Sequence, residues 1–132
     1  MAPHRILIAD DHDIVRKGLC MILAARMDLA ICGEAANGRD AIERARQLRP
    51  DLIIMDLTMP LLSGFAATHE IRKSLPDVPI LIFSMHDGSQ LMEESKRVGA
   101  QGFVTKHQAG STLLEAVDAL LAKKTYFPSE SA

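Results

Sequence analysis

Short apolar runs alternate along this chain with longer segments in which apolar residues recur at helical spacing. Each short run has the composition of a buried β-strand, and each longer segment has the three-to-four-residue period of an amphipathic helix. The five predicted strands are Arg5–Asp10, Leu29–Ala35, Leu52–Asp56, Ile80–Ser84 and Gly102–Thr105. The pattern therefore predicts five strand–helix units in succession.

Polar and turn-forming residues predict where the helices begin and end. Asn37 and Ser63 are residue types that cap helix amino termini, while Pro50 and Gly99 end the helices before them. The last helix is expected from about Gly110 to Lys124. The helical segments are thus bounded by local signals as well as by their periodicity.

Strands that are apolar throughout are buried on both faces, which is typical of a parallel sheet with helices on each side. Five strands are too few to close an eight-stranded barrel. The sequence therefore predicts one α/β domain with an open, doubly wound (βα)5 sheet. In such sheets ligands bind outside the carboxyl ends of the strands, so candidate chemistry is expected there.

Charged and polar residues follow four of the five predicted strands. Asp10 and Asp11 follow the first strand, Asp56 the third, Ser84 the fourth and Lys106 the fifth. A single carboxylate at a strand end is explained by solvation or helix capping, but the whole set is not. Three neighbouring carboxylates repel one another, which raises the pKa of at least one. With one lysine, a Mg²⁺ ion neutralises the set, so the residues predict a magnesium site.

A carboxylate beside Mg²⁺, with a hydroxyl and an ammonium group above it, can attack phosphorus and hold the phosphoryl group that it receives. These residues resemble the receiver domain of two-component response regulators. The similarity covers residues 4–125 and is carried by Ile6–His12, Pro50–Asp56, Met59, Pro60, Gly64, Ser84 and Lys106. Further details are similar to the NarL/FixJ (LuxR-type) subgroup, namely Asp11–Asp13 with Arg16 and Gly18, Ser84–His86 and Tyr126–Pro128.

The resemblance implies a flavodoxin-like fold with strand order 2-1-3-4-5 and a defined role for each site residue. Asp56 would be the phosphoacceptor. Asp11, Asp56 and the backbone carbonyl of Thr58 would bind Mg²⁺ directly, with Asp10 acting through water. The Ser84 hydroxyl and the Lys106 ammonium would each bond a phosphoryl oxygen.

Two positions differ from the residues that are usual in receiver domains. Phe103 would occupy a switch position that is often tyrosine, so a switch there would act by turning the phenyl ring inward after phosphorylation. Such a switch would change the face of the fourth and fifth helices, or that of the first and fifth; alternatively, Phe103 is only core filler. His107 follows Lys106 where many relatives have proline, so a trans peptide is expected there.

The resemblance also implies partners: a sensor histidine kinase, a second copy on phosphorylation, and DNA through an output domain. Residues 1–125 would form the receiver domain, and 126–132 would begin a linker to an absent carboxyl-terminal helix-turn-helix domain. A receiver that works without an output domain is the alternative. The chain would promote only its own phosphorylation and dephosphorylation and would not be an enzyme acting on other substrates.

Composition provides further evidence on nucleic-acid binding, membrane insertion, cellular compartment and histidine metal sites. The 132 residues carry 15 Lys and Arg against 17 Asp and Glu, a net charge of −2 that gives no general attraction to nucleic acid or membrane. No apolar run approaches the roughly 20 residues that span a bilayer. Cys20 and Cys32 are expected to be reduced packing thiols, which suits the cytoplasm. The five histidines show no metal-binding spacing and are expected at the surface or as helix caps.

Two other function classes share parts of this pattern. A flavodoxin-type electron carrier would need glycine, serine or threonine after the first strand to hold a flavin phosphate, but two aspartates stand there. A Mg²⁺-dependent hydrolase with an aspartyl nucleophile would need a second carboxylate two residues after Asp56, but Thr58 is at that position. Repeated turnover of a small phosphoester would distinguish such a hydrolase from a receiver.

Overall fold

The computed structural model describes residues 2–86 and 88–127 of the chain. Five strands alternate with five α-helices. The strands are β1 (His4–Ala9), β2 (Leu29–Ala35), β3 (Leu52–Met55), β4 (Ile80–Ser84) and β5 (Gly102–Thr105). The helices are α1 (Asp13–Ala24), α2 (Gly38–Leu48), α3 (Gly64–Ser74), α4 (Ser89–Val98) and α5 (Ala109–Leu121). A single turn of 3₁₀-helix over Lys106–Gln108, which the sequence pattern did not predict, joins β5 to α5.

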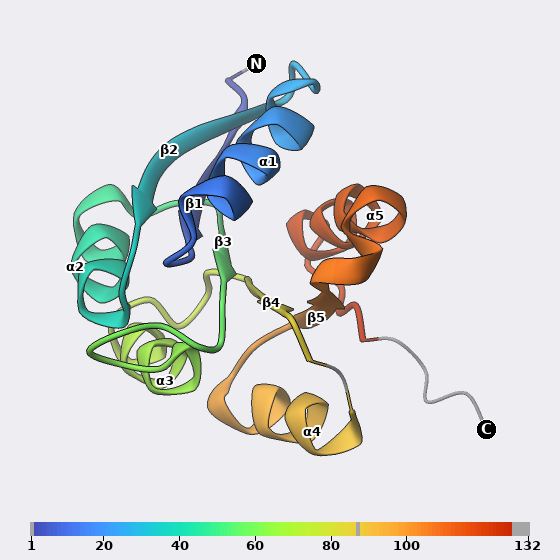
Figure 1. Ribbon diagram of the computed structural model, residues 1–132. Helices are drawn as coiled ribbons and strands as arrows, with labels where there is room; N and C mark the ends of the chain where they lie inside the picture. Colours follow the sequence, from blue (N-terminus) through green and yellow to red (C-terminus); the bar gives the residue numbers. More distant parts are fainter. Residues whose placement is uncertain (1, 87, 128–132) are drawn as a thin grey trace.

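The strands form one parallel sheet in the order β2-β1-β3-β4-β5, which confirms the predicted fold class and strand order. Helices α1 and α5 cover one face of the sheet, and α2, α3 and α4 cover the other (Figure 1). Strand β1 pairs with β3 in register, so that Ala9 lies opposite Met55. The residues that follow these two strands therefore leave the sheet side by side.

Alternate residues of each strand enter two separate cores. Leu7 and Ile53 pack under α2 and α3, while Ile6, Ile8 and Ile54 pack under α1 and α5. All five side chains are buried, and burial of each contributes roughly 1.5–3 kcal/mol to folding. Because both faces of the sheet are covered, the strands show no polar alternation in sequence.

The predicted helix boundaries agree closely with the structure, except at the carboxyl end of α5. The side chains of Asn37 and Ser63 accept hydrogen bonds from the first turns of α2 and α3, and Gly99 ends α4 with a φ of 104°. Helix α5 was expected to reach Lys124 but ends at Leu121. Lys123 adopts a left-handed φ of 63°, which a continuing helix excludes.

The segment after α5 returns to the edge of the sheet. Tyr126 forms a parallel bridge with Gly102, and its carbonyl accepts a 2.9 Å hydrogen bond from the Phe103 amide. The ring of Phe127 packs against the core under α4, with the Lys96 Nζ 4.9 Å from the ring centroid. Residues 126 and 127, expected to begin a linker, thus cover the free edge of β5, while 128–132 lie outside the described residues. Within the described part of the chain, no helix is long and apolar enough to cross a membrane.

Candidate functional site

Three carboxylates converge at the carboxyl edge of the sheet. Asp10 and Asp11 follow β1, and Asp56 follows the adjacent strand β3. Asp10 is 1% exposed and Asp56 is 3% exposed. One side-chain oxygen from each of these three carboxylates, together with one His12 nitrogen, lies within 4.8 Å of the others. The structure therefore brings together the acidic residues that the strand pattern placed at one edge.

Lys106 brings the compensating positive charge from the far side of the sheet. Its Nζ lies 2.7 Å from Asp10 Oδ2 and 3.4 Å from Asp56 Oδ1, and its side chain is 7% exposed. The unpredicted 3₁₀ turn after β5 begins at this residue. A buried ammonium between two buried carboxylates offsets their desolvation cost, because each charge has an opposite partner.

The environment of Asp56 raises its pKa to about 6. Burial is the largest cause, and the negative charge of Asp10 is the next. Lys106 and a backbone hydrogen bond from Thr58 act in the opposite direction. The sequence predicted a raised pKa from repulsion between carboxylates; that repulsion contributes, but burial contributes more. At neutral pH, Asp56 is mainly ionised and able to act as a nucleophile.

Ser84 ends β4, the strand that lies between those leading to Asp56 and to Lys106. Its side chain is buried, and its Oγ accepts a 3.0 Å hydrogen bond from the His86 amide. This bond orients the hydroxyl oxygen within the β4–α4 loop and leaves its hydrogen available for donation. A hydroxyl donor and an ammonium therefore stand on the two strands beyond Asp56.

Two residues outside the predicted site hold its loops in place. The Gly64 amide donates to the Leu57 carbonyl, and a Cβ on Gly64 would lie 2.0 Å from the Asp56 carbonyl oxygen. Only glycine allows α3 to begin so close to Asp56. Arg16 donates to the Asp10 carbonyl at 2.5 Å and to Glu34 Oε1 at 3.1 Å, which ties the loop after β1 to β2. The sequence feature that could have indicated this role is the position of Arg16, a basic residue one turn into the helix that follows the acidic pair Asp10 and Asp11.

His12 lies beside the acidic residues at an exposed position just before α1, in agreement with the predicted surface or helix-cap location. Its side chain is 62% exposed, but Nδ1 lies 3.3 Å from Asp10 Oδ1 and 3.2 Å from Asp11 Oδ1. It occupies the N-cap position of α1 without a side-chain capping bond. The available signal was its position directly after two aspartates at a strand end.

Comparison with known proteins identifies the family. Residues 6–118 match the family model described as the response regulator receiver domain. The chain belongs to this receiver domain family.

Relatives of this receiver domain include transcriptional regulators. It is 39% identical over 113 residues to the transcriptional regulatory protein LnrK of Bacillus subtilis, covering 86% of this chain and 51% of LnrK. It is 40% identical over 123 residues to the oxygen regulatory protein NreC of Staphylococcus carnosus, covering 92% of this chain and 57% of NreC. The receiver domain thus spans about half the length of these two relatives.

A solved structure extends the similarity to the whole fold. A LuxR-family two-component response regulator from Aurantimonas sp. SI85-9A1 superposes with a TM-score of 0.91 at 38% identity. The match covers 95% of this chain and 89% of that one. The predicted resemblance to LuxR-type receivers is therefore confirmed at the level of both sequence and fold.

The remaining predicted positions of the receiver domain lie around the acidic cluster or behind it. Thr58 is exposed in the loop after Asp56, and the peptide between Lys106 and His107 is trans, as expected. Phe103 is 1% exposed and already packs inside the core under α4. An outward-to-inward turn of this ring therefore has no outward starting point in the present conformation, and its role as a switch stays a prediction.

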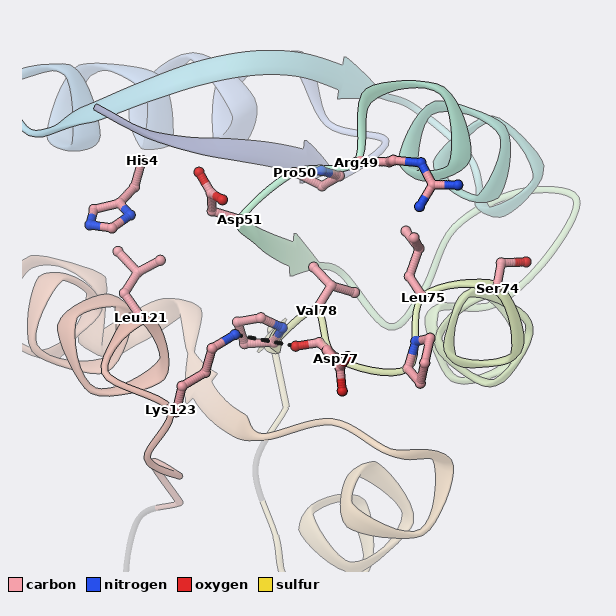
Figure 2. A pocket seen from close by; sticks show the side chains of 12 residues that line it. His4, Arg49, Pro50, Asp51, Ser74, Leu75, Asp77, Val78, Leu121 and Lys123 are labelled. Carbon is pink, nitrogen blue, oxygen red and sulfur yellow. Dashed lines mark hydrogen bonds between the residues drawn. The ribbon is translucent and has the colours of Figure 1, made fainter. Parts of the chain in front are cut away.

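A pocket at the opposite edge of the receiver domain contains none of the predicted site residues. It has a volume of about 420 Å³ and lies at the amino ends of the strands (Figure 2). His4, Asp51, Leu121 and Lys123 are among its lining residues (Figure 2). The concentration of buried charge, and not a hollow, distinguishes the carboxyl edge from this one.

Proposed function

We propose that Asp56 accepts a phosphoryl group from a phosphohistidine of a sensor histidine kinase in a Mg²⁺-dependent reaction. The observation that carries this proposal is the position of Asp56 in a receiver domain: a buried carboxylate beside Asp10, with the Lys106 ammonium within 3.4 Å. We propose further that the phosphorylated chain controls transcription through a DNA-binding output domain.

The donor set around Asp56 fits a magnesium ion. The carboxylates of Asp11 and Asp56 and the backbone carbonyl of Thr58 are hard oxygen ligands of the kind that Mg²⁺ prefers, and Asp10 would act through water. Two of these aspartates are buried and one side chain is partly exposed, which leaves a route for a hydrated ion. The ion would supply the positive charge that allows an anionic phosphoryl donor to approach three carboxylates.

The side chains of the domain would perform the transfer itself. A carboxylate oxygen of Asp56 forms a bond to phosphorus as the bond from phosphorus to the histidine nitrogen of the donor breaks. Lys106 would move from its contact with Asp56 to a phosphoryl oxygen, keeping a positive charge beside the new negative charge. The Ser84 hydroxyl would donate a hydrogen bond to another phosphoryl oxygen.

The output would depend on parts of the protein beyond this domain. The segment matched to the transcriptional regulatory protein LnrK covers only 51% of that relative, and the net charge of −2 gives this domain no general attraction to DNA. We therefore assign DNA binding to an output domain reached through a linker that begins within 126–132. Pairing of two phosphorylated copies and a cytoplasmic location, which the free Cys20 and Cys32 support, complete the proposal.

The proposal is tested by incubating the protein with acetyl phosphate and Mg²⁺ and measuring its intact mass. The wild-type chain should gain one phosphoryl group, and prior addition of EDTA should prevent the gain. Asp56→Asn should remain unlabelled, whereas the control Asp77→Asn, at the exposed opposite edge, should be labelled normally. Equal labelling of Asp56→Asn and wild type would overturn the assignment of the acceptor. Repeated hydrolysis of a small phosphoester in excess would favour the hydrolase alternative.

A further inference from the structure

We propose that Tyr126 and Phe127 form a latch that joins the end of the domain to α4, so that the latch and α4 are ordered or released together. Tyr126 packs against the core under α1 and α5, whereas Phe127 packs against the core under α4. The two residues therefore contact opposite faces of the sheet beside β5. The latch itself does not depend on phosphoryl transfer to Asp56, but its effect on an output domain rests on the proposed function.

Backbone hydrogen bonds dock the latch on the edge of β5. The Tyr126 amide donates to the Gln101 carbonyl, and the Phe103 amide donates to the Tyr126 carbonyl, both at 2.9 Å. Gly102 forms the bridge to Tyr126, and a Cβ on this glycine would lie 3.2 Å from the Tyr126 carbonyl oxygen. Glycine thus allows the close approach. Because the Phe103 amide loses its partner when the latch leaves, its hydrogen exchange reports docking directly.

A left-handed turn after α5 directs the latch back to the sheet. Lys123 has a φ of 63°, and the Lys124 amide donates a 2.9 Å hydrogen bond to the Ala119 carbonyl across the turn. Glycine adopts this backbone conformation readily, whereas residues with a Cβ adopt it at a cost in free energy. The contacts of Tyr126 and Phe127 offset that cost, so the turn and the latch support each other.

Helix α4 has few buried side chains of its own. Of its residues Ser89–Val98, all of which the structure describes, Ser95 alone is buried, while Leu91 and Met92 are partly buried. The Ser95 hydroxyl donates a 2.7 Å hydrogen bond to the Leu91 carbonyl within the helix, so it adds no apolar contact with the sheet. A helix with few buried apolar contacts opens locally at low cost. An added aromatic contact therefore matters more to α4 than to a deeply packed helix.

Phe127 supplies such a contact at the last turn of α4. Its ring packs against the same core as Leu91 and Met92, and the Lys96 Nζ lies 4.9 Å from the ring centroid. A cation over a phenyl face contributes modestly at an exposed position, so partial burial of the ring is the larger part of the contact. The latch thus holds the carboxyl end of α4 beside β5.

This shared contact makes the order of the two segments reciprocal. If α4 loosens, Phe127 loses its cover and the latch is released; if the latch leaves, α4 loses the ring. The loop that carries Ser84 and His86 leads into the amino end of α4. A change at the carboxyl edge that moves this loop would therefore reach the latch through α4. An output domain attached after the latch would be held near α4 in the docked state and freed in the released state.

Amide hydrogen exchange measured by NMR on the unphosphorylated chain tests the inference. Phe127→Ala should speed exchange of the α4 amides and of the Phe103 amide by about tenfold. Phe127→Leu keeps most of the apolar contact and should stay nearer to wild type. The control is Ile22→Ala, which shortens a partly buried side chain of α1 on the opposite core. It should lower stability to urea without selectively exposing α4 or Phe103.

The reverse direction uses a variant that leaves the latch residues unchanged. Gln90→Gly lowers helix propensity at an exposed position in the first turn of α4, at the end of the helix remote from Lys96. It should nevertheless speed exchange of the Phe103 and Tyr126 amides by about threefold. Gln47→Gly, at an exposed position of α2, is the matched control and should leave both amides at the wild-type rate.

Three results would overturn the latch. They are an unchanged Phe103 amide in Gln90→Gly, unchanged α4 amides in Phe127→Ala, and a rise in exchange that is equal at every amide of Phe127→Ala. Circular dichroism verifies that each variant is folded, and the Gln90→Gly arm decides the question if Phe127→Ala is not. Neither arm uses Mg²⁺ or acetyl phosphate, so failure of the latch is distinguishable from failure of the proposed function.

Discussion

The two edges of the sheet use charge in different ways. At the carboxyl edge, Asp10 and Asp56 contact another charged side chain, Lys106, and all three are buried. At the amino edge, Asp51 accepts from the Arg5 amide, and the charged pairs that Arg26 forms with Asp28 and Asp118 are partly exposed instead of buried. Charges that pair with backbone groups complete the fold, whereas charges held against one another can be rearranged by a ligand.

This comparison separates stability from function. A change at the amino edge should affect at most the free energy of unfolding and should leave phosphorylation intact in the folded protein. A change at the carboxyl edge should alter phosphorylation whatever its effect on stability. The pocket in Figure 2 belongs to the first kind of region. The four changes below test the distinction.

Arg72→Met should have the largest effect on stability. The Arg72 guanidinium donates to carbonyls at the amino edge, including Val78 and Gly99 at 2.6 Å each, and burial lowers its pKa. Removing it leaves several partly buried carbonyls without a donor, at a cost of about 3–4 kcal/mol. Urea unfolding measures the loss, with the exposed Arg97→Met as control. Loss of acetyl phosphate labelling at a temperature where Arg72→Met is folded would contradict the claim that the amino edge affects stability alone.

Gly64→Ala should damage both stability and function. The new Cβ would lie 2.0 Å from the Asp56 carbonyl oxygen, so α3 and the loop after β3 must separate. Overpacking of this kind costs about 1–3 kcal/mol and would displace the Asp56 carboxylate from Lys106. Urea unfolding and the rate of labelling measure the two effects. Gly110→Ala, where a Cβ meets no neighbour within 4 Å, is the control. Normal labelling of Gly64→Ala would show that the close approach is not needed for the site.

Asp56→Asn should abolish labelling and yet stabilise the folded chain at neutral pH. The pKa of Asp56 is raised to about 6 in the folded chain, against about 4 when unfolded. The folded chain therefore binds more protons between these values, so stability falls as the pH rises through them. Replacing the carboxylate should add about 1–2 kcal/mol at pH above about 7 after allowance for screening. Urea unfolding from about pH 4 to 8 should give converging curves at the acidic end, and parallel curves would contradict the cause assigned to the shift.

The sequence predicted most of the fold because its signals are local. Apolar runs bounded by Asn37, Pro50 and Ser63 specify elements without reference to distant residues, and these boundaries are confirmed. The end of α5 was wrong because Lys123 turns away in a left-handed conformation, and no glycine or proline announced that turn. The packing of Phe127 on the core under α4 depends on a contact with a segment far away in sequence. Such contacts have no local signature.

The main residues of the candidate site were also predictable from the sequence, but two residues that contact Asp10 were not. Parallel strands bring Asp10, Asp56 and Lys106 to one edge whatever the details of the loops, so strand position alone predicted their convergence. The parts that were missed depend on side-chain direction. Arg16 and His12 stand on α1 and just before it, and their sequence spacing does not reveal that both turn back to Asp10. A period of three or four residues predicts which face of a helix is buried, but it does not predict that a side chain extends across a loop to contact a distant residue.

Lys123→Gln should have the smallest effect of the four. The Lys123 Nζ lines the amino-edge pocket and lies 3.4 Å from the Asp77 carbonyl oxygen, a long contact at an exposed position (Figure 2). A weak exposed hydrogen bond of this kind contributes less than about 0.5 kcal/mol, and glutamine retains a donor. Unfolding in urea and labelling by acetyl phosphate should both match wild type, because the contact neither completes a buried network nor approaches Asp56. A clear fall in the labelling rate with stability unchanged would mean that the two edges are coupled through the sheet, and the separation between a structural and a chemical edge would then be lost.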